Sequence, residues 1–159
     1  MKQFLVLLFA VIMMACSGGG DPAPTPTPPT PTVSVATLVK KVWTVNTAQW
    51  DGVTKYDKTS SSNVVQGYSQ YKLDLSTAGS VTLTEFDGKI FTGTYTVATD
   101  GLSLTLNGLT SADGAPTGTG GTISYSILVT PTATSLSLQQ TTAYVKASSA
   151  IVKLALVNP

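Results

Sequence analysis

The sequence predicts an all-β domain, an antiparallel meander of about eight strands that closes, or nearly closes, into a barrel. Two observations carry this prediction. Apolar residues recur at every second position along most of the chain beyond residue 40, and short segments typical of tight turns separate these runs. A meander must protect its edge strands, and closure removes them, so a barrel is favoured over a β-sandwich, which remains the alternative.

Each alternating run has one apolar face and one face rich in threonine and serine, which is typical of a half-buried strand. Strands are expected in residues 41–45, 71–75, 81–84, 91–97, 102–106, 123–129 and 136–138, around Val145, and in 152–156. Only residues 34–41 could form a helical turn or two.

Turn dipeptides and two longer segments connect these strands. Type I′ hairpin turns need a positive φ at both central positions, and Asp-Gly pairs favour them. We therefore expect two-residue turns at Asp51-Gly52, Asp87-Gly88 and Asp100-Gly101. Residues 58–67 and 111–122 are expected to form mobile surface loops.

The first residues have the pattern of an export signal. Lys2 precedes eleven apolar residues, 4–14, a run shorter than the roughly 20 needed to span a bilayer. The run ends in Met13-Met14-Ala15-Cys16, which resembles the lipobox of bacterial lipoproteins. The sequence thus predicts a signal peptide over residues 1–15 and a lipid on Cys16. An ordinary secretory peptide is the alternative, but acylation explains why the only cysteine has no disulfide partner.

A linker separates this cysteine from the foldable part. Residues 16–32 are rich in Gly, Pro and Thr, and such a segment is extended at about 3.1 Å per residue. Residues 33–159 then match one domain. Removal of the signal peptide, which contains Lys2, leaves eight lysines against eight acidic residues, with no arginine. This lack of net positive charge excludes a nucleic-acid partner.

Catalytic groups are scarce. The chain has no histidine, hence no Ser-His-Asp triad and no imidazole metal ligand, and an acylated Cys16 leaves no thiol. The remaining carboxylate pairs are Asp51 with Asp57 and Glu85 with Asp87. Asp-Gly turn chemistry explains Asp51 and Asp87, Asp57 stands outside a turn, and Glu85 is expected to face solvent or a strand neighbour. We predict no enzyme, no metal and no cofactor.

Aromatic residues suggest a binding site. Trp50, Tyr56, Tyr68 and Tyr71 flank the longest loop, where they can stack on a sugar or line the opening of an apolar cavity. The alternative is that they anchor the loop onto the barrel rim. Residues predicted to belong to the core instead are Trp43, Tyr95 and Tyr125.

The strand motifs resemble those of the lipocalin-like domain lipoproteins of Bacteroidota, a family of calycin-like β-barrels. The matching segments are Lys41-Val42-Trp43-Thr44-Val45, Tyr71-Lys72-Leu73-Asp74-Leu75, Asp87-Gly88, Phe91-Thr92-Gly93-Thr94-Tyr95-Thr96-Val97, Leu102-Ser103-Leu104-Thr105-Leu106 and Val152-Lys153-Leu154-Ala155-Leu156-Val157-Asn158-Pro159. The resemblance implies a lipocalin-like barrel on an envelope lipoprotein, anchored to the outer membrane on an undetermined side.

Two functions remain open. The first is a tethered, non-catalytic binding module that holds a small apolar or amphipathic ligand in its interior. The alternative is a structural or interaction lipoprotein with a filled barrel that contacts another envelope or surface component. An enclosed cavity of about 300 Å³ or more would favour the first. The barrel is full if these residues all point inward: Leu73, Leu75, Phe91, Tyr95, Leu104, Ile127 and Leu154.

Overall fold

The structure is a computed structural model that describes residues 33–159. The predicted signal peptide, the lipidated Cys16 and the linker lie outside the described residues. Within 33–159 the chain forms nine strands, one short α-helix and two 3₁₀ helices. In chain order these are α1 (Val35–Leu38), β1 (Val42–Trp50), β2 (Val53–Asp57), η1 (Gln66–Gln70), β3 (Lys72–Asp74), β4 (Ser80–Thr84), β5 (Ile90–Val97), β6 (Ser103–Thr110), β7 (Ile123–Val129), β8 (Ser135–Gln140), η2 (Val145–Ala147) and β9 (Val152–Val157).

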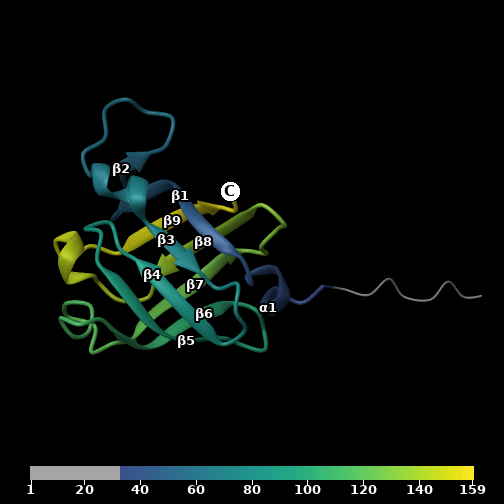
Figure 1. Ribbon diagram of the computed structural model, residues 1–159. Coiled ribbons are helices and arrows are strands. Elements are labelled where there is room, and N and C mark those ends of the chain that lie inside the picture. Colours follow the sequence, from purple (N-terminus) through teal and green to yellow (C-terminus); the bar gives the residue numbers. More distant parts are fainter. Residues whose placement is uncertain (1–32) are drawn as a thin grey trace, which may run out of the picture. The chain divides into compact units, whose positions relative to one another are not determined.

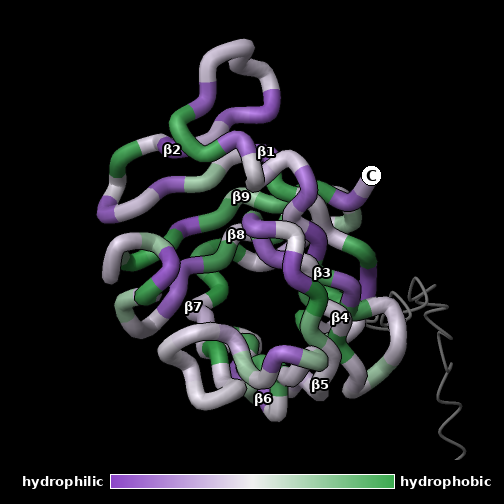
Figure 2. Tube along the Cα trace, turned by 60° about the vertical axis from the view of Figure 1, so that its left-hand side comes forward, coloured by the Kyte–Doolittle hydropathy of each residue, from purple (hydrophilic) through white to green (hydrophobic). Residues whose placement is uncertain are grey.

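Eight of these strands close into a barrel. Strands β3 to β9 pair in sequence order, all antiparallel, and β1 joins both ends of the series by pairing with β3 and with β9. The strands accordingly form a ring in Figure 2. This closure confirms the predicted eight-stranded antiparallel barrel and excludes the β-sandwich. Strand β2 is an addition, since it pairs only with β1 and forms a hairpin that stands out from the ring (Figure 1).

The barrel interior is the hydrophobic core. Burial alternates along the strands, as in β8, because successive side chains point to opposite sides of a sheet. Every residue proposed to fill the interior is buried: Leu73, Leu75, Phe91, Tyr95, Leu104, Ile127 and Leu154. The predicted core aromatics are buried as well, namely Trp43, Tyr95 and Tyr125.

The three Asp-Gly pairs form different turns. Asp51 and Gly52 both have positive φ, 47° and 80°, which confirms a two-residue hairpin turn between β1 and β2. At the other two pairs the prediction of such a turn is wrong, because only Gly88 and Gly101 have positive φ. The backbone N–H of Glu85 donates to the carbonyl of Lys89, so that loop is longer and needs the left-handed conformation only at its glycine.

Three apolar residues do not lie where the alternation placed them. Val145 is in η2 rather than a strand and is exposed, because Tyr144 and Ala147, three residues apart, point inward instead. Leu102 is exposed in the turn before β6. Val129 is exposed beyond a register shift between β7 and β8, which turns its side chain outward.

The two ends of the barrel differ. At one end lies α1, where the buried Val39 accepts a 2.8 Å hydrogen bond from Trp43 Nε1. The opposite end carries the β1–β2 hairpin, the β4–β5 turn (residues 85–89) and the segments 111–122 and 141–151 (Figure 1). We call this the loop end. The predicted long connections 58–67 and 111–122 both lie between strands, and their mobility stays a prediction. None of the helices in residues 33–159 has the length and apolarity to cross a membrane.

Candidate functional site

The four aromatic residues predicted as a ligand site do come together at the loop end. Tyr68, from η1, is the centre of the cluster: its ring centroid lies 6.1 Å from that of Tyr56 and 6.0 Å from that of Tyr71. Trp50 Nε1 donates a 2.8 Å hydrogen bond to the Tyr68 hydroxyl. Phe86, which the sequence did not indicate, completes the cluster with its centroid 4.9 Å from Tyr68.

These aromatic side chains pack mainly against one another. Tyr56, Tyr68 and Tyr71 are buried, whereas Trp50 and Phe86 are partly exposed, and Lys55 Nζ lies 5.7 Å from the Trp50 ring centroid. The contacts fasten β2 and η1 to the barrel. Such packing is what the loop-anchoring interpretation requires, whereas ligand binding by these four residues stays a prediction.

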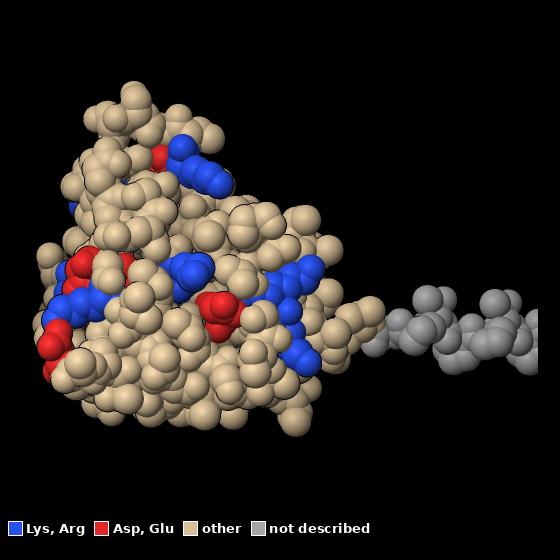
Figure 3. All heavy atoms as spheres, in the orientation of Figure 1, with Lys and Arg blue, Asp and Glu red and all other residues tan. Residues whose placement is uncertain are grey.

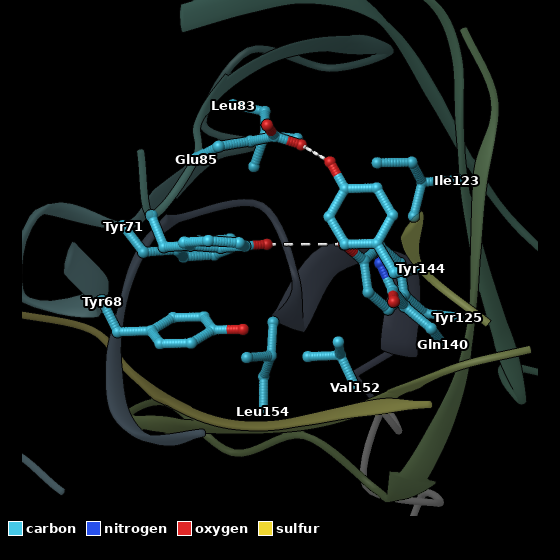
Figure 4. Close-up of a pocket in the computed structure, with 11 residues that line it drawn as sticks. Tyr68, Tyr71, Leu83, Glu85, Ile123, Tyr125, Gln140, Tyr144, Val152 and Leu154 are labelled. Carbon is cyan, nitrogen blue, oxygen red and sulfur yellow. Dashed lines mark hydrogen bonds between the residues drawn. The ribbon is translucent and has the colours of Figure 1, made fainter. Parts of the chain in front are cut away.

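Behind the cluster lies a buried carboxylate. Glu85 directly follows β4, is only 2% exposed, and accepts a hydrogen bond from the Tyr144 hydroxyl (Figure 4). It also accepts one from Lys146 Nζ. Lys146 also donates to Asp87 over 2.8 Å. We call Glu85, Asp87, Tyr144 and Lys146 the Glu85 network. The expectation that Glu85 faces solvent or a strand neighbour is therefore wrong.

A pattern in the sequence could have revealed this inward direction. Val81, Leu83 and Glu85 follow one another at period two, so Glu85 continues the buried face of β4. Its partners Tyr144 and Lys146 could not be found in this way, because they lie about sixty residues later in a segment without alternation. Only the tertiary structure brings them together.

Burial and pairing shift the pKa values within the network. Burial acts to lower the pKa of Lys146, but its hydrogen bonds to Asp87 and Glu85 outweigh burial, so the pKa lies above its usual value. Burial likewise acts to raise the pKa of Asp87, and the contact with Lys146 outweighs it, so the pKa is lowered. Burial, aided by Glu85, raises the pKa of the Tyr144 phenol. The network thus holds a cation between carboxylates.

The barrel has almost no free interior volume. The cavity between Tyr68, Tyr71, Glu85, Tyr125 and Gln140 measures about 10 Å³, roughly the room of one water molecule (Figure 4). The hydroxyls of Tyr71 and Tyr125 face each other across it at 3.4 Å, and burial raises the pKa of Tyr125 to about 12. A small-molecule site commonly needs about 300 Å³ or more. The interior is therefore filled by side chains.

A larger depression lies outside this interior, at the loop end. It measures about 350 Å³ and lies between the segments 118–122 and 141–144, with Ile123, Ser124 and Gln140 at its base. We call it the rim groove. Ile123, Gln140 and Tyr144 border both the rim groove and the inner cavity, so these three side chains separate them.

The other chemical possibilities are limited. Asp51 precedes β2 and Asp57 is its last residue, and the two do not form a pair: Asp51 accepts from the backbone of Ile151, and Asp57 accepts from Thr59. Glu85 and Asp87 do come together, with Lys146 between them. Within residues 33–159 no group of three or more metal-ligating side chains is found. Most of the face in Figure 3 is uncharged.

The fold defines the class to which the chain belongs, the eight-stranded antiparallel β-barrel proteins. No protein-family model and no curated protein matches the chain. Two crystal structures are similar to it. A lipocalin-like protein from Bacteroides uniformis ATCC 8492 is 14% identical, with a TM-score of 0.46 over 75% of this chain and 96% of that one. An uncharacterized protein from Bacteroides eggerthii DSM 20697 is 14% identical, with a TM-score of 0.45 over 75% and 98%. Similarity at this level transfers no ligand or activity.

Proposed function

We propose that this chain is a lipid-anchored protein of the bacterial cell envelope, whose barrel is a non-catalytic recognition module that acts through its outer surface at the loop end. The filled interior is the observation that carries this proposal. With a cavity of about 10 Å³, a small apolar ligand would have to displace core side chains to enter. The proposal therefore takes up the filled-barrel alternative rather than an internal ligand site.

The anchor in this proposal is the lipid on Cys16, with residues 16–32 as spacer and the outer membrane as its place. The described chain begins with Val33 at the α1 end, away from the loop end. The spacer is thus attached at the barrel end opposite the aromatic cluster and the rim groove, where we propose contact with another envelope or surface component. This arrangement supports recognition at the loop end.

Affinity capture tests the recognition module. The tagged full-length protein would be isolated from membranes, its bound components identified, and the complex examined by native mass spectrometry. We expect a retained partner and no apolar molecule within the barrel. One apolar molecule bound per chain would overturn the filled-barrel proposal.

Two exposed valines at the loop end and one at the α1 end allow a matched comparison. Val53, in the β1–β2 hairpin, and Val145 lie at the loop end, and Val129 lies towards the α1 end. Val53→Asp or Val145→Asp should reduce capture of the partner, because a charge replaces apolar contact surface. Val129→Asp should not. The reverse pattern would contradict recognition at the loop end.

The anchor is tested separately. A Cys16→Ala variant should lose labelling by radioactive palmitate and should leave the membrane fraction. The matched control is Ser17→Ala, which keeps the cysteine and should behave as the wild type. Continued labelling of the Cys16→Ala variant would show that the anchor proposal is wrong.

A further inference from the structure

The inner cavity is polar although it lies inside the hydrophobic core. Its volume of about 10 Å³ is close to the minimum that holds one water molecule, and a cavity takes up water only where polar groups line it. Such groups are present here. The lining includes four tyrosines, a glutamate and a glutamine, namely Tyr68, Tyr71, Tyr125, Tyr144, Glu85 and Gln140 (Figure 4).

Three of these polar groups already have partners within the protein. The Tyr68 hydroxyl accepts a 2.8 Å hydrogen bond from Trp50 Nε1, and the Tyr144 hydroxyl donates to Glu85. Glu85 accepts a second hydrogen bond from Lys146. Unused hydrogen-bonding capacity inside the cavity therefore belongs to the other three groups.

Gln140 is the group that most needs a partner. Burial alternates along β8, so the Gln140 side chain points into the barrel together with those of Leu136 and Leu138. Within residues 33–159 no protein group donates a hydrogen bond to Gln140 Oε1, which is shielded from the solvent outside the barrel. A buried acceptor without a donor is destabilising, because it has given up its hydrogen bonds to water. A donor inside the barrel would remove this cost.

The hydroxyls of Tyr71 and Tyr125 are only loosely paired. They lie 3.4 Å apart, whereas O–H···O hydrogen bonds are usually about 2.5–3.0 Å long. A phenol hydroxyl both donates and accepts, so one contact of this length leaves both groups with capacity for a further partner. Tyr71 precedes β3, Tyr125 lies in β7 and Gln140 ends β8, so the three groups come from separate parts of the chain.

We infer that the inner cavity binds a single water molecule, which donates to Gln140 Oε1 and forms its other hydrogen bonds with the hydroxyls of Tyr71 and Tyr125. Three polar partners are typical of a buried water molecule. The water links the start of β3 to β7 and β8 beneath the loop-end aromatic cluster. This site goes beyond the proposed function, because it depends neither on the lipid anchor nor on a partner.

The bound water should exchange slowly with bulk solvent. Ile123, Gln140 and Tyr144 separate the inner cavity from the rim groove, and the hydrogen bond to Glu85 holds Tyr144 in place. Escape of the water therefore requires Tyr144 and its segment, 141–151, to move away from the barrel. A water molecule enclosed in this way can be detected in solution as well as in a crystal.

A crystal structure of the full-length protein, at a resolution that shows ordered water, tests the inference directly. We expect one water molecule within about 3.0 Å of Gln140 Oε1 and of at least one of the two hydroxyls. A cavity without water would overturn the inference. So would a Gln140 amide turned so that its Oε1 accepts directly from the Tyr125 hydroxyl.

Variants identify the groups that hold the water in solution. Magnetic relaxation dispersion of the water oxygen nucleus detects a water molecule that stays bound for longer than the protein takes to tumble. Gln140→Leu should abolish the contribution of this water, whereas Gln139→Leu, on the outward face of the same strand, should retain it. Tyr125→Phe should likewise abolish it. Its control is Tyr95→Phe, which removes a buried hydroxyl that donates to the Leu75 carbonyl outside the cavity lining.

An unchanged contribution in both Gln140→Leu and Tyr125→Phe would refute the site, and the wild-type crystal structure decides the question if either variant does not fold. Failure of this inference is distinguishable from failure of the proposed function. If a partner is captured through the loop end but the cavity holds no water, only the water site is wrong. If the water is present and nothing is captured, only the recognition module is refuted.

Discussion

Glu85 shows how one side chain ties together distant parts of the molecule. A buried carboxylate loses its hydration and is tolerated only when other groups satisfy it. Here Tyr144 and Lys146 do so, and both come from the segment between β8 and β9. The pairing therefore fixes this segment against the β4–β5 turn and forms one boundary of the inner cavity.

Removal of the lysine should expose this dependence. In Lys146→Met the Glu85 charge keeps only its hydroxyl partner, and loss of one member of a buried ion pair commonly costs about 3–5 kcal/mol. We expect a reduction of that order in the free energy of unfolding, measured with urea. Lys153→Met, at an exposed position on β9, should change it by less than about 0.5 kcal/mol. Equal effects would mean that the ion pair contributes nothing.

Asp87 should make the stability of the folded protein depend on pH in the acidic range. Its pKa is lower in the folded state than the value of 3.8 expected for an unfolded chain. Its stabilising contribution is thus complete above that value and is lost as the pH falls through the folded-state pKa. Asp87→Asn should flatten the fall in melting temperature on acidification below pH 3.8. Asp113→Asn, at an exposed acid, serves as control; an identical acid profile in wild type and Asp87→Asn would contradict the prediction.

Among the elements, η1 depends on a close approach to the β4–β5 turn. A Cβ on Gly67 would lie 1.9 Å from the carbonyl oxygen of Phe86, a separation that no relaxation of a side chain can relieve. Glycine is therefore needed for η1 to bring Tyr68 against Phe86. The loop-end aromatic cluster is assembled by this backbone contact as much as by its rings.

The variant Gly67→Ala should displace η1. We expect a loss of about 1–3 kcal/mol in stability, the range for forcing extra atoms into a packed site, together with a change in tryptophan fluorescence as Trp50 loses its contact with Tyr68. The neighbouring exposed Ser69→Ala should change neither quantity. A Gly67→Ala protein with unaltered fluorescence would show that η1 does not depend on this approach.

For the whole molecule, closure and filling are linked. Eight strands make a barrel narrow enough for side chains to fill, and here they do. The inward leucines and aromatics form one continuous core, which β1 and the strands from β3 to β9 surround. This packing supports our proposal that the barrel acts through its outer surface.

The packed interior can be measured through Leu104, which is fully buried. Leu104→Ala should lower the free energy of unfolding by about 2–5 kcal/mol, because the packed neighbours close the resulting cavity only in part. Leu102→Ala, two residues earlier and exposed, should have an effect below about 0.5 kcal/mol. An unchanged free energy of unfolding in Leu104→Ala would mean that the interior is loosely packed. It would contradict the filled-barrel proposal.

The sequence by itself determined the strands and most of their order, because period-two alternation and turn chemistry are local properties. It also placed Trp50, Tyr56, Tyr68 and Tyr71 near one another, since all four flank a single loop. The strand predicted around Val145 was wrong, because a single apolar residue does not show an alternation.

Only the tertiary structure decided the rest. The pairing of β1 with β9, the partners of Glu85 and the rim groove all join segments that are far apart in the chain, and no local pattern specifies which distant segments meet. Whether an eight-stranded barrel is hollow depends on how its inward side chains fit together, and the cavity of about 10 Å³ answered that question.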